Sequence, residues 1–151
     1  MHITPADLAD PRVIALLRVH FTRAHAVSPP GSAHALDLGA LQSPSITLWA
    51  AWDDDALLGV GALHQLAPDH GEVKSMHTAE AARGRGVGAA LLRHIIAAAR
   101  ERGHTRLSLE TGSMAYFHPA IALYRRHGFV ECGPYAHYVA DPNSVFMTLA
   151  L

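Results

Sequence analysis

The sequence predicts an α+β domain in which a mixed β-sheet is covered by helices on both faces. Apolar, strand-like runs recur along the chain, amphipathic helical patterns lie between them, and no repeat or linker divides the 151 residues. A chain of this length buries roughly two thirds of its unfolded surface, which is enough for one core. We therefore expect a single domain over residues 1–151.

The N-terminal half is expected to form two helices and a β-hairpin. Asp10 precedes a proline, which is typical of a helix start, and apolar residues then recur at helical spacing to about Ala26. A turn-rich break separates this helix from a shorter helical candidate, which runs from about His34 to Leu41. Three aspartates then join two apolar runs, which predicts a hairpin of strands 46–52 and 57–66.

The C-terminal half is expected to alternate strands with helices. Apolar residues at helical spacing run from Val87 up to Gly103. A second, short helix is stopped by Gly128, because glycine suits the left-handed position that ends helices. Apolar or alternating runs predict the remaining strands, which are Glu72–Thr78, Arg106–Glu110, Phe129–Glu131 and Val145–Leu149.

Residues 83–88, Arg-Gly-Arg-Gly-Val-Gly, lie between a predicted strand and the longer of these two helices. Glycines let backbone N–H groups approach an anion closely, and the first turn of a helix adds unpaired donors and the positive end of its dipole. The guanidinium groups of Arg83 and Arg85 add positive charge. This segment therefore predicts a phosphate-binding loop.

Two interpretations of this loop differ in the ligand that they imply. Counted from Gly84, it satisfies the dinucleotide fingerprint G-x-G-x-x-G/A, with Glu110 about 20 residues further on as the ribose-binding acid of an NAD-dependent enzyme. That fingerprint needs its first glycine directly after the strand, whereas residues 79–83 intervene, and only about 60 residues remain for a second nucleotide-binding half. Counted from Arg83, the loop reads Arg-x-x-Gly-x-Gly and resembles the pyrophosphate loop of the GNAT acetyltransferases.

A second segment strengthens this resemblance. Ala120, Leu123 and Tyr124 share one helix face, and Gly128 and Phe129 follow them. The segment matches the pattern A-x-x-L-Y-x-x-x-G-F, which in the GNAT family follows the phosphate loop by a helix and a strand, as it does here. Over most of its length the chain resembles a GNAT superfamily N-acetyltransferase of the small, single-domain bacterial type. The resemblance implies a mixed, mostly antiparallel sheet flanked by helices.

The resemblance also implies acetyl-CoA as the acetyl donor. In the family, the strand before the phosphate loop binds the pantetheine arm through backbone groups, which here would belong to Met76, His77 and Thr78. Because such pairing depends little on side chains, the His77 side chain is compatible both with a solvent-facing position and with a substrate contact. The pyrophosphate would bind the loop residues Arg83, Gly84, Arg85, Gly86, Val87, Gly88 and Ala89.

The same resemblance assigns catalytic roles. Tyr124 occupies the position of the family's general-acid tyrosine, which protonates the departing thiolate; a purely structural tyrosine is the alternative. Glu72 is the first candidate for the base that deprotonates the amine, with Glu110 or water as alternatives. A backbone N–H near Met76 is the expected oxyanion donor. Many family members have Asn where this chain has Phe117, so the contact of that Asn with the pantetheine is in question.

The acceptor is expected to bind where the loop between the first two helices meets the strand ends. A primary amine of a small molecule is the expected acceptor, because nothing indicates an extended polar groove for a peptide or protein amine. Oxygen acceptors and other acyl donors stay open. The candidate contacts are Ser28, Pro30, Ser113, Tyr116 and Tyr138.

Composition and charge argue against several other functions. The formal net charge of −1 gives no electrostatic basis for a nucleic-acid or membrane partner, and no apolar run approaches the length of a membrane span. The single Cys132 and the lack of a leader pattern favour a reducing, cytoplasmic location. Twelve histidines show no recognisable ligand spacing, so no metal is expected. A homodimer stays open.

These observations predict an acetyl-CoA-dependent N-acetyltransferase that transfers acetyl directly to an amine. A non-catalytic acyl-CoA-binding or sensing module on the same fold is the first alternative, and an NAD-dependent enzyme is the second. Tyr124 separates the enzyme from the module, because a protein that only binds the coenzyme needs no acid beside the sulfur.

Overall fold

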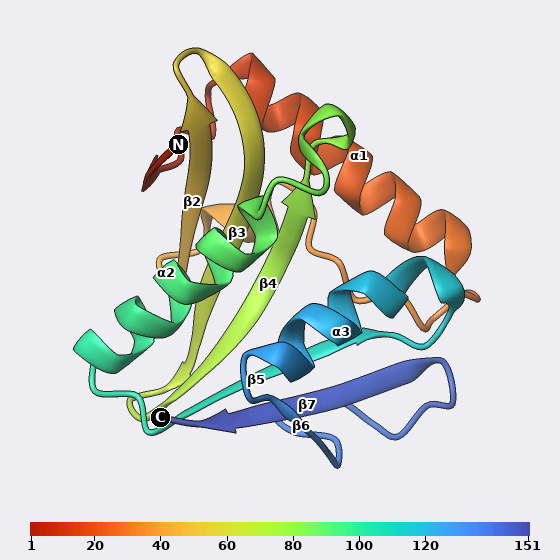
Figure 1. The fold of residues 1–151 in the computed structure, drawn as a ribbon. Helices are drawn as coiled ribbons and strands as arrows, with labels where there is room; N and C mark the ends of the chain where they lie inside the picture. Colours follow the sequence, from red (N-terminus) through yellow and green to blue (C-terminus); the bar gives the residue numbers. More distant parts are fainter.

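The computed structural model describes residues 1–151 and contains one seven-stranded sheet with three α-helices (Figure 1). In space the strands follow the order β1-β2-β3-β4-β5-β7-β6, and only β4 and β5 run parallel. The strands are β1 (His2–Pro5), β2 (Ile46–Asp53), β3 (Ala56–Ala67), β4 (His70–Thr78), β5 (Arg106–Gly112), β6 (Val130–Cys132) and β7 (Ser144–Ala150). The helices are α1 (Pro11–Val27), α2 (Val87–Glu101) and α3 (His118–Arg126), with the short 3-10 turns η1 (Ala40–Gln42), η2 (Glu80–Ala82) and η3 (Ala115–Phe117).

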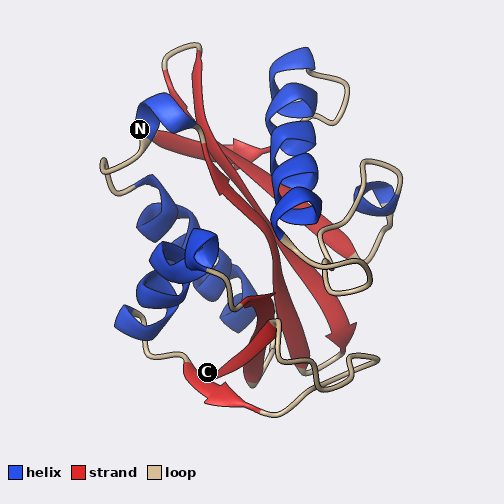
Figure 2. Cartoon of the chain, turned by 90° about the vertical axis from the view of Figure 1, so that its right-hand side faces the viewer, coloured by secondary structure: helices blue, strands red, loops and turns tan.

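Helices cover both faces of the sheet (Figure 2). On one face α1 packs over a smaller core that includes Val13, Leu17 and Val60. On the other face α2 and α3 pack over a larger core in which Leu91 and Ile95 are almost completely buried. Burial of apolar side chains on both faces stabilises this three-layer arrangement. The predicted α+β class is confirmed.

Local sequence explains where the two long helices begin. The Asp10 carboxylate accepts a hydrogen bond from the backbone N–H of Arg12 at 2.9 Å, and Pro11 occupies the first turn of α1. α2 begins differently, because Gly86 stands at its N-cap position with a φ of 78° and offers no capping side chain. The backbone donors at the start of α2 are therefore available to another acceptor.

β4 and β5 are paired at one end and diverge at the other (Figure 1). Their parallel pairing joins His70–Glu72 to Arg106–Ser108 and stops there, although β4 continues to Thr78 and β5 to Gly112. β4 stays paired with β3 as far as Thr78, so only its edge toward β5 is open. Backbone groups along that edge are available to another extended chain.

A β-bulge at Ser75 changes which side chains of β4 face α1. His77 lies opposite Val60 of β3 and Lys74 lies opposite Ala62, so β4 has one extra residue in this stretch. Ser75 itself takes a left-handed φ of 55°. Because of the extra residue, simple alternation along the strand does not hold across the bulge. The β4 side chains that share the α1 face are Glu72, Lys74 and His77.

The predicted helix from His34 to Leu41 is wrong, because this region forms only the 3-10 turn Ala40–Gln42. Tertiary contacts hold the segment in an irregular conformation. The carbonyl oxygen of His34 accepts a hydrogen bond from Lys74 Nζ at 3.2 Å, and Ser32 Oγ donates to Asp141 at 2.6 Å. These long-range partners outweigh the weak helical pattern of the segment.

The other predicted elements are confirmed, with ends that shift by one or two residues. The edge strand β1 is not predicted, because its four residues end in a proline and show no clear alternation. None of the helices combines the length and apolar character that crossing a bilayer requires.

Candidate active site

A cleft of about 500 Å³ lies where β4 and β5 diverge. Its walls come from both of these strands, from α1 and α3, from the loop before α2 and from the segment 32–35. The open edge of β4 and side chains from both helical layers therefore border the same space. A concave site of this size with several polar groups is the candidate active site.

The glycine-rich loop presents unpaired backbone donors at this cleft. The N–H groups of Gly84, Arg85 and Gly86 donate to no backbone carbonyl, and those in the first turn of α2 have no acceptor within the helix. Gly84 and Gly86 have φ angles of 77° and 78°, and a Cβ added to either would meet no atom within 4 Å. The loop therefore fits an anion beside its N–H groups.

The structure separates the two arginines of the loop. Arg85 Nη2 lies 3.2 Å from Asp53 Oδ2, and Arg85 does not line the cleft. Only one of the two predicted cations is therefore at the site. The loop residues that line the cleft are Arg83, Gly84, Gly86, Val87, Gly88 and Ala89, and β4 adds Met76, His77 and Thr78.

Tyr124 of α3 lines the cleft while its ring packs in the core. The residue is 6% exposed, and its ring lies edge-on to Phe129 with 5.8 Å between centroids. Burial alone raises the pKa of Tyr124, so the hydroxyl keeps its proton at neutral pH. No hydrogen bond within the protein holds this hydroxyl. The site thus contains a neutral proton donor with no competing partner.

Glu72 does not occupy the predicted position of a base at the cleft. It is 1% exposed, does not line the cleft, and accepts hydrogen bonds from Tyr135 and Tyr138 at 2.5 and 2.7 Å. Burial acts to raise the pKa of Glu72, but Lys74 and the hydrogen bonds from Tyr135, Tyr138 and His64 together lower it. Its neighbours hold this carboxylate ionised, so its environment is that of a structural anion and argues against the predicted role as the base.

Glu110 of β5 has the environment that a base requires. It lines the cleft, and its Oε2 accepts a hydrogen bond from Ser144 at 2.7 Å. Burial raises the pKa of Glu110, against smaller opposing effects of Ser144 and Lys74. A carboxylate with a raised pKa at a cleft accepts protons more readily than an ordinary one. Of the two acidic candidates, the structure therefore favours Glu110.

The predicted acceptor contacts are divided between the cleft and its surroundings. Ser28 and Tyr116 line the cleft, whereas Pro30, Ser113 and Tyr138 do not. Ser113 Oγ donates instead to the carbonyl of a neighbouring loop at 3.0 Å. Tyr138 is buried behind the lining. Its hydroxyl donates a hydrogen bond to the Glu72 carboxylate and accepts one from Lys74 Nζ. Tyr138 therefore supports the site without facing the cleft.

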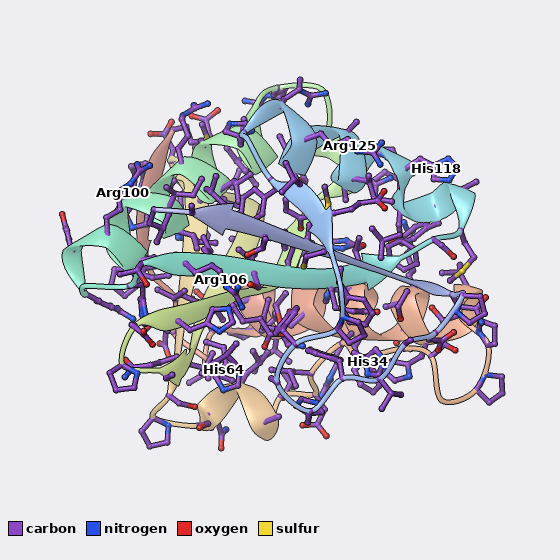
Figure 3. All side chains as sticks on the ribbon, turned by 90° about the horizontal axis from the view of Figure 1, so that it is seen from below. His34, His64, Arg100, Arg106, His118 and Arg125 are labelled. Carbon is purple, nitrogen blue, oxygen red and sulfur yellow. The ribbon has the colours of Figure 1, made fainter.

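Pattern reasoning missed several polar residues on the α1 side of the cleft. His34 lies against the loop between β6 and β7, with its ring centroid 5.0 Å from that of Tyr138 (Figure 3). Only Lys74 carried a signal, because it alternates with Glu72 along a predicted strand. The others reach the cleft through contacts between distant segments. The missed residues are His20, His34, Lys74 and Ser75.

Comparison with known proteins decides the family. The model of the Acetyltransferase (GNAT) family matches residues 12–129. The chain belongs to the GNAT family. A curated GNAT relative, the uncharacterised N-acetyltransferase YsnE of Bacillus subtilis (strain 168), is 50% identical over 151 residues, which is 100% of both chains. The predicted family and the assignment as an acyltransferase are confirmed.

Solved structures agree with this GNAT assignment. A crystal structure from Klebsiella pneumoniae, described as an acyl-CoA N-acyltransferase, has a TM-score of 0.80 at 30% identity and covers 99% of this chain and 97% of that one. A GNAT family acetyltransferase from Elizabethkingia anophelis, solved with acetyl-CoA bound, has a TM-score of 0.74 at 19% identity, with 99% and 97% covered. The dinucleotide interpretation is wrong, because the GNAT sheet has one parallel strand pair where that interpretation needs a parallel sheet.

The GNAT cleft of this chain contains a pair of neutral histidines. His20 Nδ1 of α1 and His77 Nδ1 of β4 lie 3.2 Å apart, so one ring donates a hydrogen bond and the other accepts it. Burial, with a smaller contribution from nearby positive charges, chiefly Arg83 for His77, lowers the pKa of each histidine to about 4. The His77 side chain therefore faces α1 and the cleft, and not the solvent.

This histidine pair makes stability depend on pH in the acidic range. The unfolded chain takes up protons on both histidines near their ordinary pKa of about 6.5, whereas the folded chain does so only near pH 4. We expect the free energy of unfolding to fall as the pH decreases from 6.5 to 4. Each histidine contributes up to about 1.4 kcal/mol per pH unit.

Urea denaturation across this pH range measures the effect. The variant His20→Gln is expected to show a shallower fall than the parent protein, because Gln does not titrate. His2→Gln, which changes an exposed histidine in β1, is the matched control and keeps the parent slope. Equal slopes in all three proteins would contradict the assignment of the pair as neutral and buried.

Proposed function

We propose that the protein is an acetyl-CoA-dependent N-acetyltransferase that transfers acetyl directly to a primary amine of a small molecule. One observation carries this proposal: a single cleft collects the loop of unpaired N–H groups, the open edge of β4, the Tyr124 hydroxyl and the Glu110 carboxylate. The GNAT neighbour solved with acetyl-CoA bound supports the choice of donor. Only an enzyme needs an acid and a base at such a site.

The proposed donor site consists mainly of backbone groups. The extended pantetheine arm fits along the open edge of β4 at Met76, His77 and Thr78. The pyrophosphate fits the N–H groups of residues 84–89, with Arg83 as the neighbouring cation. The Met76 N–H, next to the bulge, is the proposed donor to the thioester oxyanion.

Phe117 gives this donor site an apolar wall. It lines the cleft at the position where many family members have Asn. Its ring packs so closely on Gly112 that a Cβ at residue 112 would overlap it. We propose that ring contact replaces the amide contact of those family members, and that Gly112 is needed to admit the ring.

The proposed chemistry divides the proton transfers between the two faces of the sheet. Glu110 takes a proton from the acceptor's ammonium group, so that the neutral nitrogen can attack the thioester carbon. The nitrogen–carbon bond forms and the carbon–sulfur bond breaks. Tyr124 gives its proton to the departing thiolate, and the second proton lost by the nitrogen returns to Tyr124 through solvent. Tyr124 belongs to the core under α2 and α3, so it reaches the opening from the face opposite to α1.

Two hydrogen bonds that join segments beside the cleft support a small acceptor. Ser32 Oγ donates to Asp141 at 2.6 Å and accepts from Asn143 Nδ2 at 3.4 Å, so the segment 32–35 is tied to the loop before β7. A peptide acceptor requires an extended groove or a free strand edge beyond the reacting amine. The hydrogen bonds between Ser32 and the loop before β7 therefore support a small molecule in preference to a peptide or protein amine.

A thermal-shift titration with acetyl-CoA, CoA and NAD tests the proposed donor. We expect the two coenzyme A species, and not NAD, to raise the melting temperature, because a ligand at about 100 times its Kd adds roughly 2.7 kcal/mol of stability. Acetyl-CoA with an accepted amine is expected to release free thiol. The variant Gly86→Asp is expected to lose the coenzyme shift, since it places a carboxylate at the proposed pyrophosphate site.

Gly31→Asp is the matched control for this titration. Gly31 has a φ of 84°, no atom near its missing Cβ and no place in the cleft lining. Both variants therefore carry the same backbone strain and the same added charge, and only Gly86→Asp should lose the shift. An unchanged shift in folded Gly86→Asp would show that the loop does not bind the pyrophosphate. A shift without thiol release from any amine would favour the non-catalytic binding module.

A further inference from the structure

Lys74 presents a hydrogen-bond donor to the acceptor side of the cleft. Its side chain is 11% exposed, and its Nζ donates to the Tyr138 hydroxyl at 2.8 Å and to the carbonyl of His34 at 3.2 Å. The nearest oxygen of Glu72 lies at 4.0 Å, too far for a hydrogen bond. An ammonium group has three N–H donors, so one remains unused in a residue that lines the cleft.

Ser75 adds a second donor beside it. The residue is 8% exposed and lines the cleft, and its hydroxyl has no hydrogen-bond partner in the protein. A buried hydroxyl without a partner costs stability, so its presence calls for a ligand that supplies the missing acceptor. Ser75 also holds the left-handed φ of the bulge, a conformation that costs a non-glycine residue free energy.

Glu110 lies across the strand opening from these two donors. Glu72 of β4 is in register with Ser108 of β5, and each strand then continues by two residues, to Lys74 and to Glu110. Residues at equal distances from a parallel register pair lie on the same face, which is here the α1 face. Lys74 and Glu110 nevertheless form no ion pair, although both line the cleft. Both side chains therefore border the cleft without neutralising each other directly.

We infer that the acetyl acceptor carries a carboxylate close to its amine, and that Lys74 Nζ and Ser75 Oγ bind this carboxylate while Glu110 receives the amine. A carboxylate only accepts hydrogen bonds, which matches the unused donors of Lys74 and Ser75. Its single negative charge suits the one ammonium group of Lys74, which already neighbours Glu72. Free α-amino acids and their small derivatives have this arrangement of groups. The inference rests on the proposed function and specifies its substrate class.

Matched sets of acceptors test the inference. We expect thiol release from acetyl-CoA with α-amino acids, and a kcat/KM lower by about 10- to 100-fold for the corresponding α-carboxamides and decarboxylated amines, the usual worth of a hydrogen bond to a charged group. Equal or better values for the amides and amines would overturn the inference. Coenzyme binding without turnover of any amino acid would also overturn it, while the proposed coenzyme site would still stand.

The variant Ser75→Ala tests whether the preference for a carboxylate arises from Ser75 and Lys74. Ser75 makes no hydrogen bond in the protein, so we expect the variant to keep its fold and its thermal shift with acetyl-CoA. Its KM for an amino acid should rise about tenfold, while its KM for the decarboxylated amine stays unchanged. Lys74→Arg retains the charge and Lys74→Met removes it, so preference for the carboxylate should survive only in the former. An equal change in KM for both acceptors in Ser75→Ala would contradict the assignment.

Discussion

Replacement of Tyr124 by Phe is expected to lower the turnover number by about 10² to 10⁴ and to leave the dissociation constant of acetyl-CoA nearly unchanged. The change removes the proposed proton donor and keeps the ring that packs against Phe129. Because the hydroxyl has no partner in the protein, its loss should not lower the melting temperature. Steady-state thiol release and a thermal-shift titration measure the two quantities separately.

Tyr135→Phe is the control for this experiment. Tyr135 is also a buried tyrosine, but it donates to Glu72 and does not line the cleft. We expect Tyr135→Phe to lower stability, because the buried carboxylate loses a donor, and to retain turnover in the folded protein. Turnover at the parent level in Tyr124→Phe would remove Tyr124 from the chemistry and leave it as a structural tyrosine.

The variant Glu110→Gln is expected to lower kcat/KM by about 10² to 10⁴ and to remove the dependence of activity on the ionisation of residue 110. Burial raises the pKa of Glu110, and a base acts only when it is deprotonated. In the parent protein, activity should therefore decline as the pH falls through this raised pKa. In Glu110→Gln the low remaining activity should lack that decline. A pH series of kcat/KM is the measurement.

Unlike its activity, the free energy of unfolding of Glu110→Gln should not fall. A carboxyl group with a raised folded-state pKa contributes stability below its unfolded pKa of about 4.3, and this contribution is lost as the pH rises through the folded pKa. Ionised Glu110 therefore costs stability at neutral pH, and Glu110→Gln should be at least as stable as the parent. Glu72→Gln is the contrasting variant: it should lose stability and keep the pH dependence of kcat/KM. If Glu72→Gln abolished that dependence, Glu72 would be the base.

The conformation of the glycine-rich loop and the position of the tyrosine helix could be predicted from the sequence, because each depends on neighbouring residues. Gly84 and Gly86 act through their own φ angles and the helix that follows them. Tyr124 reaches the cleft because of its position in a short helix between two strands. The strands and long helices also follow from local apolar periodicity.

The choice between the two acidic candidates depends on distant segments and could not be predicted in this way. Glu72 is removed from the cleft by Tyr135 and Tyr138, which come from a loop more than sixty positions along the chain. The bulge at Ser75 is equally hidden, because nothing in the local sequence requires one extra residue there. That bulge changes the alternation of β4, so the face of His77 could not be read from the strand pattern.

The divergence of β4 and β5 has a consequence for how proteins of this architecture can evolve. If acetyl-CoA is bound by main-chain groups of β4 and of the glycine loop, substitutions of most side chains leave that binding intact. The side chains proposed to select the acceptor, Lys74, Ser75 and Glu110, instead line the same opening, where Lys74 and Glu110 share the α1 face. If these proposals hold, substitutions at these positions change which acceptor binds and leave the binding of acetyl-CoA intact. New specificities then require few mutational steps and no change of fold.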